Sequence, residues 1–199
     1  MPLMPSTAWP RLLAALLLAT SVLAGCTPMS AQNPPSALRP VNAVADGGDE
    51  RVLLAGHDVV AYFTQGRHQP GSAQFESVYE GVTLRFASAE HKAAFDADPK
   101  RYLPQFGGYC ANGIAYGIPW GGDADTWAII DGRLYIFGGQ ASKDAFMLDP
   151  RANLALAEQY WREEIAGRNS LLQRAYRLVI RVPHYQSGAE LAQRGAEAQ

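Results

Sequence analysis

The sequence has very few cysteines and lacks the motifs of the common catalytic sites. Only two of its 199 residues are cysteine, which excludes a disulfide-rich scaffold and a metal site built from four thiolates. It contains no Cys-x-x-Cys pair, no His-Glu-x-x-His, no Gly-x-Ser-x-Gly and no phosphate-binding glycine loop. The chain therefore carries no standard signature of a dithiol redox enzyme, a zinc protease, a serine hydrolase or a nucleotide-binding protein.

The chain also lacks an excess of positive charge. Its 17 lysines and arginines are outnumbered by 19 aspartates and glutamates, which gives a net charge of −2. Bulk electrostatics offer nothing that attracts nucleic acid, so no nucleic-acid partner is expected. Hydrophobic residues make up 48% of the sequence, which is ample for one core, and we expect one folded domain.

The N-terminus lacks a hydrophobic run long enough to cross a bilayer. The apolar stretch at residues 12–23 follows Arg11 and is shorter than the roughly 20 residues of a transmembrane helix. Its length is typical of a signal peptide, which we place at residues 1–25. The sequence Leu23-Ala24-Gly25-Cys26 resembles the lipobox of bacterial lipoproteins, in which the cysteine sulfur is acylated, as with palmitate, and the chain is cut before it. The alternative is an ordinary secretory signal that ends near a chance cysteine.

A lipid on Cys26 predicts an outer-membrane lipoprotein that faces the periplasm of a bacterial cell envelope. Thr27, which follows the cysteine, favours the outer membrane in this resemblance. Cys110 is then left without an intramolecular disulfide partner. Because an odd thiol in an oxidising compartment is unusual, Cys110 is a candidate functional residue.

The remaining chain divides by composition into three segments. Residues 26–49 are rich in Pro, Ser, Ala and Gly and predict a flexible tether, and residues 50–166 predict the folded domain. Residues 167–199 contain an amphipathic helix and a polar tail. In residues 169–182 the apolar and the arginine side chains form opposite helical faces, so the apolar face either docks on the domain or lies on an anionic membrane surface.

The domain's pattern predicts an α+β fold: a small antiparallel sheet with helices on one face, followed by C-terminal helices. Two apolar runs within residues 51–65 are typical of strands, Glu80-Gly81 predicts a hairpin turn, and a helix starts near Ser88 and ends at Asp98-Pro99. The same order recurs 51 residues later. Seven identities at this offset indicate two copies of a turn, strand and helix, or else convergence under common structural demands: Gly81/Gly132, Phe86/Phe137, Lys92/Lys143, Ala94/Ala145, Phe95/Phe146, Asp98/Asp149 and Pro99/Pro150.

Residues 52–161 resemble the YHS domain family, in its exported single-domain branch. The resemblance rests on "GHDVVAYFTQG", on "FASAEHKAAFDADPKRY" followed by "GGYCA", and on "TWAIIDGRLYIF". It implies a fold related to treble-clef metal-binding modules, which occur in proteins that handle copper and other heavy metals. The sequence departs from the metal-binding relatives where they carry two cysteines, because these positions are Ala87 and His91 here.

The candidate metal ligands are Cys110, His91, His57 and Asp58. Thiolate with imidazole suits copper or zinc, and a carboxylate in the set suits iron. Each has an ordinary alternative: Cys110 as an inert core residue, His91 as a solvated surface histidine, and Asp58 as the cap of a turn. His68 and His184 lie in polar segments that indicate no site, and Asp123 and Asp125 read as a surface turn without the ligand spacing of a calcium-binding loop.

Three functions are therefore expected from the sequence. The leading one is a lipid-anchored periplasmic protein that binds a transition metal, copper first, through Cys110 and a histidine, and either passes it to a periplasmic metal-handling protein or senses it. The alternatives are an adaptor lipoprotein without metal and an enzyme that uses the Cys110 thiolate, activated by His91 or His57.

Overall fold

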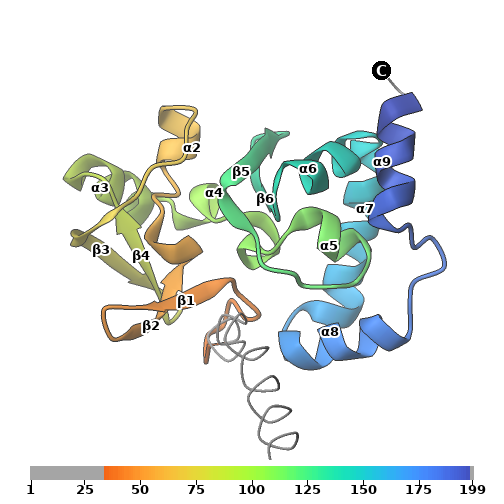
Figure 1. Cartoon of the computed structure of the whole chain (residues 1–199). Coiled ribbons are helices and arrows are strands. Elements are labelled where there is room, and N and C mark those ends of the chain that lie inside the picture. The colour runs from red at the N-terminus through yellow and green to blue at the C-terminus, as the bar shows by residue number, and fades with distance from the viewer. Residues whose placement is uncertain (1–33, 198–199) are drawn as a thin grey trace, which may run out of the picture.

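The computed structural model of the chain describes residues 34–197 and confirms the α+β class (Figure 1). The predicted signal peptide at 1–25 and the lipid site at Cys26 lie outside the described residues. No helix within residues 34–197 is both long and apolar enough to cross a membrane.

A four-stranded sheet forms one half of the fold. Its strands are β1 (Ala43–Asp46), β2 (Asp49–Leu53), β3 (Ser72–Tyr79) and β4 (Val82–Phe86), in the spatial order β1-β2-β4-β3. The hairpin pairs β1/β2 and β3/β4 are antiparallel, but β2 and β4 are parallel. The expectation of an antiparallel sheet is therefore wrong at its centre, because residues 54–71 cross over between β2 and the second hairpin.

The second half contains a two-stranded antiparallel sheet, β5 (Asp123–Ile130) and β6 (Arg133–Phe137). Its short helix α5 (Ala111–Ala115) precedes the hairpin, and α6 (Gln140–Met147) and α7 (Pro150–Tyr160) follow it. A single π-helical turn extends α7 over Trp161–Ile165. In the first half, α2 (Ala61–Thr64) precedes the β3–β4 hairpin, and α3 (Ala89–Ala97) and α4 (Pro99–Tyr102) follow it.

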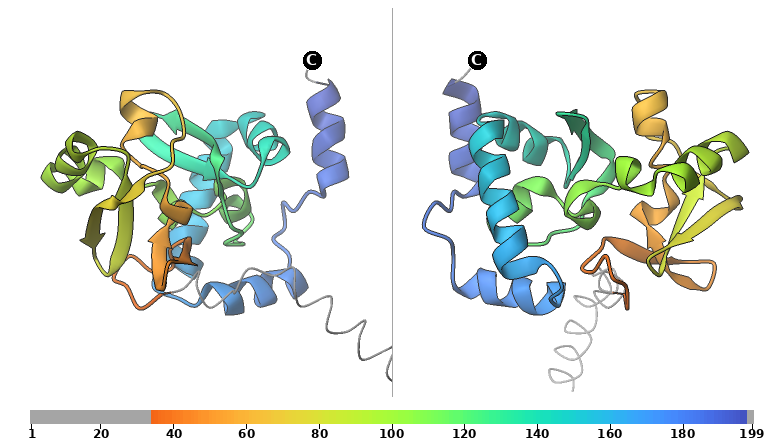
Figure 2. Two further views of the ribbon diagram at one scale, coloured as in Figure 1. Left: turned by 60° about the vertical axis from the view of Figure 1, so that its left-hand side comes forward. Right: turned by 180° about the vertical axis from the view of Figure 1, so that it is seen from behind.

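The two halves have the same arrangement of strands and helices at the predicted offset of 51 residues. The bounds of β5 and β6 lie 51 residues after those of β3 and β4, and the hairpin registers match residue for residue at this offset. Asp98 and Asp149 have nearly the same backbone angles, φ −149° and ψ 75° against φ −148° and ψ 76°. Two buried clusters follow the two halves, one around Phe86 and Phe95 and one around Phe137 and Phe146, and Leu134 and Ile136 of β6 join the first. Figure 2 shows the two halves side by side from two further directions.

Part of the predicted tether belongs to the fold. Strand β1 lies within residues 26–49, and Val41 and Ala43 are buried in the first cluster. The side-chain amide of Asn42 donates hydrogen bonds to the carbonyl oxygens of Gly108 and Gly122, 3.1 and 3.0 Å away. The predicted domain boundary at residue 49 is therefore wrong. The segment has no periodic hydrophobic pattern that would mark it as structured, and residues far away in the sequence hold it in place.

The second apolar run of the domain is a helix rather than a strand. Asp58 Oδ1 accepts hydrogen bonds from the backbone amides of Val60 (2.8 Å) and Ala61 (3.3 Å), which satisfies the free donors at the start of α2. The β-branched residues Val59 and Val60 lie in the turn that this cap stabilises. Local capping therefore overrides the strand propensity of the run.

The C-terminal segment forms α8 (Ser170–Val179) and α9 (Gly188–Glu197). Helix α8 is amphipathic as predicted, but the expectation that its apolar face docks on the domain is wrong. Arg174 and Arg177 are buried against the domain, whereas Leu172 and Val179 are 69% and 78% exposed. The reason is a set of polar partners: Arg174 Nε donates to the carbonyl oxygen of Pro119 (2.7 Å), and Arg177 pairs with Glu164.

Candidate functional site

The structure places the four predicted ligands in three separate settings. Asp58 and His91 lie together, because the His91 Nδ1–H donates to Asp58 Oδ2 over 2.6 Å. His57 lines an open pocket between the two repeats. Cys110 lines a different pocket, which no histidine lines. The expected combination of Cys110 with a histidine is therefore not brought together.

Asp58 is a structural hub of the first repeat. Its side chain is fully buried, and Oδ2 accepts a second hydrogen bond from the backbone amide of Ala87 (2.8 Å). Together with the cap of α2, these bonds join the start of α2, the end of β4 and the first turn of α3. All of its acceptor positions are directed at donors of the chain, so Asp58 is committed to holding the repeat together rather than to a ligand.

Cys110 holds the equivalent position in the second repeat. The backbone amide of Asp58 donates to Gln69 O (2.8 Å) and that of Cys110 donates to Trp120 O (2.9 Å). The two acceptors are 51 residues apart and the two donors 52, so the loop between them is one residue shorter in the second repeat. Cys110 Sγ accepts from the Gly113 amide at 3.4 Å and lies 3.1 Å from the hydroxyl of Ser142, which is 51 residues after His91. The Asp58–His91 and Cys110–Ser142 pairs are thus two versions of one contact between a helix cap and the following helix.

This environment gives Cys110 no activating base. The residue is 3% exposed, and its polar partners are a hydroxyl and a backbone amide. A reactive thiolate needs a nearby positive charge or a general base, usually with access for a substrate. Arg177 and Arg181 line the same pocket as Cys110, but no His, Asp or Glu side chain does, so the sulfur has no general base beside it among the described residues. Its low exposure then favours a buried structural residue over a nucleophile.

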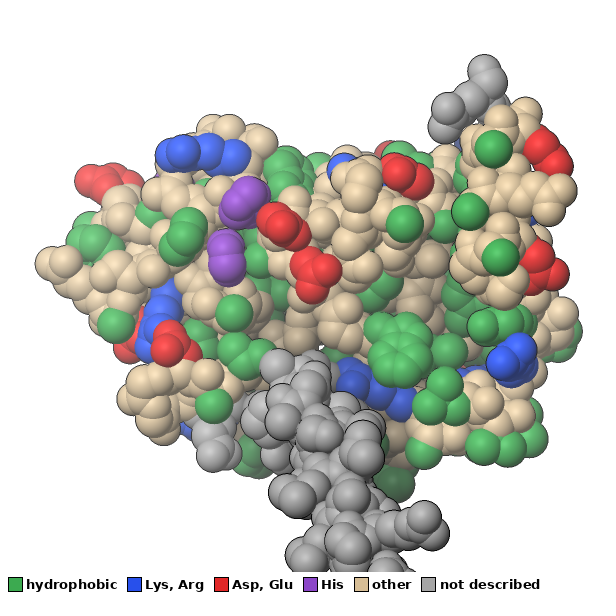
Figure 3. Space-filling model, in the orientation of Figure 1, with side chains coloured by type: hydrophobic (Ala, Val, Ile, Leu, Met, Phe, Trp, Pro, Cys, Tyr) green, Lys and Arg blue, Asp and Glu red, His purple; other side chains and the backbone are tan. Residues whose placement is uncertain are grey.

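The pocket between the repeats brings histidine and aspartate side chains together. It has a volume of about 570 Å³, and its titratable lining residues are His57, His68, Asp123 and Asp125. Figure 3 shows histidine side chains directly beside acidic side chains on this face, near the middle of the molecule. Both repeats contribute, since the histidines flank α2 of the first and the aspartates belong to β5 of the second.

His57 has the tautomer of a metal ligand. Its Nδ1 lies 3.0 Å from the carbonyl oxygen of Leu54, which accepts a hydrogen bond only if Nδ1 carries the proton. The lone pair is then on Nε2. Metal-binding histidines usually donate their other ring N–H to a carbonyl or carboxylate in this way, which fixes the ring orientation.

The separation of the two imidazoles is compatible with one shared ion. The ring centroids of His57 and His68 are 6.0 Å apart, at an interplanar angle of 52°. An ion at about 2.0–2.1 Å from a ring nitrogen lies about 3.2 Å from that ring's centroid, so two rings that share it can be up to about 6.4 Å apart. Common coordination also requires that a nitrogen of each ring faces the shared ion, which the exposed His68 side chain can reach by rotation.

The two aspartates give the pocket negative charge at a position where it is unfavourable. Burial, reinforced by the nearby charge of Asp125, raises the pKa of Asp123 above its usual value. A cation in the pocket would relieve this repulsion. Within residues 34–197, however, no three His, Cys, Asp or Glu side chains already converge as a metal-binding group. Coordination by a carboxylate therefore requires a side-chain rearrangement.

Sequence reasoning missed three of these four residues. His68 lies in a polar loop, and Asp123 and Asp125 were expected to be an ordinary surface turn. The one feature of the sequence that could have pointed to these residues is the repeat. Strand β5 begins at Asp123, and when the two repeats pack together the start of this strand lies near His57. Without the packing of the two halves, no spacing in the sequence connects His68 with Asp123.

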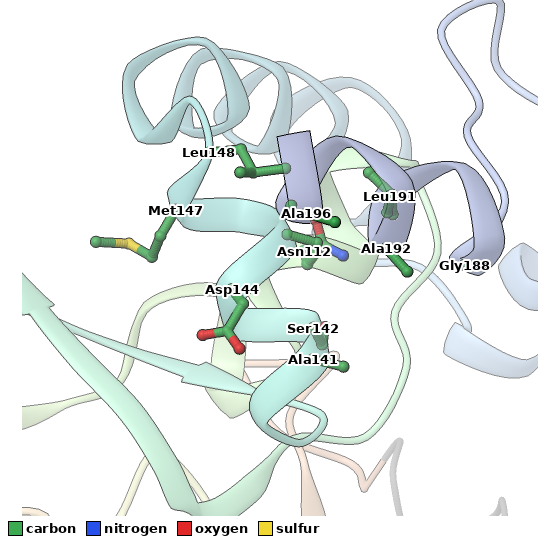
Figure 4. Close-up of a pocket in the computed structure, with 12 residues that line it drawn as sticks. Asn112, Ala141, Ser142, Asp144, Met147, Leu148, Gly188, Leu191, Ala192 and Ala196 are labelled. Atoms are coloured by element: carbon green, nitrogen blue, oxygen red, sulfur yellow. The ribbon is translucent and has the colours of Figure 1, made fainter. Parts of the chain in front are cut away.

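A larger cavity lies elsewhere and has different chemistry. It has a volume of about 780 Å³, between α6 and α9, and is lined mainly by alanine and leucine side chains (Figure 4). The side chains of Asp144 and Met147 point away from α9 in this view. Asp144 is the only acidic side chain among its described lining residues, which include no histidine. We therefore take the pocket between the repeats as the candidate site.

No protein-family model, curated protein or solved structure matches this chain. The resemblance to YHS domains thus stays a prediction that rests on the quoted motifs. Any functional assignment rests on the residues of the site itself.

Proposed function

We propose that this protein is a metal-binding module of the bacterial cell envelope and that it holds one divalent transition-metal ion in the pocket between its repeats. His57 and His68 supply the primary ligands, and Asp123 or Asp125 completes the set. The observation that carries the proposal is the His57 ring, whose Nδ1–H is directed at Leu54 O while its second nitrogen is free for a ligand.

The donor set narrows the metal. Two neutral imidazoles with carboxylates suit Zn²⁺, Cu²⁺, Ni²⁺ or Fe²⁺, whereas Cu⁺ prefers thiolates and thioethers. Cys110 lies outside this pocket, so the ligands we propose are nitrogen and oxygen atoms, and the copper site with a cysteine ligand that was expected from the sequence is not retained. The same four residues bind Mg²⁺ or Ca²⁺ poorly, since those ions prefer oxygen ligands alone.

We also propose that the protein works at a membrane, through a lipid on Cys26 and with a metal-handling protein of the periplasm as its partner. Support for the lipid comes from the lipobox sequence that ends at Cys26. The pocket's opening supports exchange with a partner, because the exposed His68 and Asp125 lie at its surface. The thiol-enzyme alternative has no support from the setting of Cys110.

The test is metal binding by untagged full-length protein in detergent, measured by isothermal titration calorimetry with Zn²⁺ and by electron paramagnetic resonance with Cu²⁺. We expect His57→Ala and His68→Ala each to weaken binding by more than about tenfold and to reduce the nitrogen hyperfine structure of the Cu²⁺ spectrum from that of two imidazoles to that of one, and the double variant to lose it. Cys110→Ser and His184→Gln, which lie outside the pocket, should bind as the unmodified chain does.

Two results would refute the proposal. If Cys110→Ser abolished metal binding and His57→Ala did not, Cys110 rather than His57 would be the metal ligand. Absence of stoichiometric binding by the unmodified chain would favour an adaptor protein without metal.

A further inference from the structure

Helix α8 presents its hydrophobic face to solvent. The exposed large apolar side chains of this segment are Leu171, Leu172, Tyr176, Leu178, Val179 and Ile180. They form one side of the helix, while the polar side packs on the domain. Figure 3 shows hydrophobic side chains along the edge of the molecule where α8 lies. A surface helix normally buries this face, so its exposure requires an occupant.

The docked side of α8 is fixed by specific polar contacts. Gln173 Nε2 donates to the carbonyl oxygen of Gly117 (3.0 Å) and to Glu164 Oε2 (2.8 Å), and Arg177 Nε donates to the same carboxylate oxygen (2.9 Å). Turning the helix to bury its leucines would break all of these bonds and expose Glu164. The apolar face is therefore held outward by the fold.

The beginning of the described chain lies on the same side of the molecule as α8. The Gly167 amide, three residues before α8, donates to the carbonyl oxygen of Arg39 over 3.0 Å. Figures 1 and 2 show residues 34–41 beside the N-terminal end of α8 in every view. Seven residues lie between Cys26 and Pro34, so the two are at most about 30 Å apart along an extended chain. A lipid on Cys26 would therefore hold α8 close to the bilayer surface.

The charges at the two ends of α8 fit the same surface. Arg168 precedes the helix and Arg181 follows it, and both are exposed. Exposed arginines that flank an apolar helical face are attracted to anionic headgroups, while the face itself enters the boundary between headgroups and acyl chains.

We infer that α8 is an interfacial membrane helix: a lipid bilayer containing anionic headgroups is the surface that its apolar face contacts, as a second attachment beside the lipid of Cys26. The inference rests on the membrane part of the proposed function and is independent of the metal. The two attachments on one side orient the domain, so that its position above the membrane is defined rather than free.

The test uses full-length lipidated protein reconstituted into vesicles of phosphatidylethanolamine and phosphatidylglycerol. A single spin label is attached at Val179→Cys in a Cys110→Ser background, and its collisions with oxygen and with a water-soluble nickel complex are compared. The matched control is Val78→Cys on β3, because Val78 is a similarly exposed valine, 66% against 78%, on the other repeat. If Cys110→Ser does not fold, Cys110 is kept, since it is buried from the label.

We expect the label at 179 to become accessible to oxygen and protected from nickel when vesicles are added, with no change at 78. Flotation of the vesicles separately reports the lipid attachment. Protein that floats but leaves position 179 as exposed to nickel as position 78 overturns the inference and leaves the anchor intact. Protein that does not float refutes both. Spin–spin broadening at 179 would instead show a second copy of the chain on α8 and would likewise overturn the inference.

Discussion

Replacing Asp58 by alanine should destabilise the protein strongly, because this carboxylate is the acceptor for several buried donors at once. It accepts from the backbone amides of Val60, Ala61 and Ala87 and from the ring of His91. Leaving one buried donor without a partner costs about 1–3 kcal/mol, and here four donors lose the same acceptor. Water that enters the vacated volume offsets part of the sum. We expect Asp58→Ala to lower the free energy of unfolding by about 3–5 kcal/mol.

The second repeat provides the matched control. Cys110→Ala removes the equivalent helix cap, but there the loss is one long N–H···S hydrogen bond of 3.4 Å and a contact with Ser142. We expect a cost of roughly 1 kcal/mol. Asp58→Asn keeps the side-chain volume and one acceptor oxygen, so it should fall between the two alanine variants.

Urea denaturation followed by far-ultraviolet circular dichroism measures all three variants on one scale. The midpoint should fall most for Asp58→Ala at an unchanged slope. If Asp58→Ala and Cys110→Ala were equally stable, the buried carboxylate would not be the hub that its contacts indicate. If Asp58→Asn matched Asp58→Ala, the lost negative charge rather than the number of lost acceptors would dominate.

Further predictions concern the repeat, the N-terminal segment and the pocket. Phe86→Ala and Phe137→Ala empty the same buried position in the two halves, and each should cost about 3–5 kcal/mol in a single cooperative transition; two separate transitions would contradict one folding unit. Gly107→Ala places a Cβ 2.4 Å from the carbonyl oxygen of Pro40 in the N-terminal segment, at φ +60°, and should cost more than about 2 kcal/mol. Gly132→Ala, at φ +73° in open space, should cost about 1 kcal/mol, and equal urea midpoints for the two variants would show that the N-terminal segment is not packed against Gly107. The raised pKa of Asp123 in the folded state makes its contribution to stability fall as pH rises above the unfolded value, so Asp123→Asn should raise the urea midpoint near neutral pH but not at about pH 3. A stabilisation that is equal at both pH values would contradict this cause.

Much of the fold could be predicted from local signals. The turn at Glu80-Gly81 is visible because both residues take positive φ angles, 50° and 80°, which suits glycine at the second position. Asp98-Pro99 ends α3, and Pro99 then opens α4 at its first turn, where a proline is tolerated. The seven identities at an offset of 51 residues correctly predicted two halves with the same order of strands and helices.

The rest depends on contacts between distant residues. Strand β1 has four residues and no periodic pattern, and it is held by β2 and by the bonds of nearby Asn42 across the molecule. The amphipathic pattern of α8 defines two faces, but the basic face is the buried one because distant polar partners, Glu164 and the carbonyl oxygens of Gly117 and Pro119, meet it there. The pocket joins side chains from both halves, which have no relation in sequence until the halves pack.

The repeat also determines how many ions the proposed site can take. A duplicated scaffold offers two equivalent positions, but its side chains have diverged between them. The position equivalent to His57 is Tyr109, whose ring is fully buried in the second core, and that of His68 is Pro119. The counterparts of Asp123 and Asp125 are the uncharged Ser72 and Gln74. The backbone is thus nearly symmetric, but the ligand residues occur in only one of the two equivalent positions. Titration with metal should therefore saturate at one ion per chain.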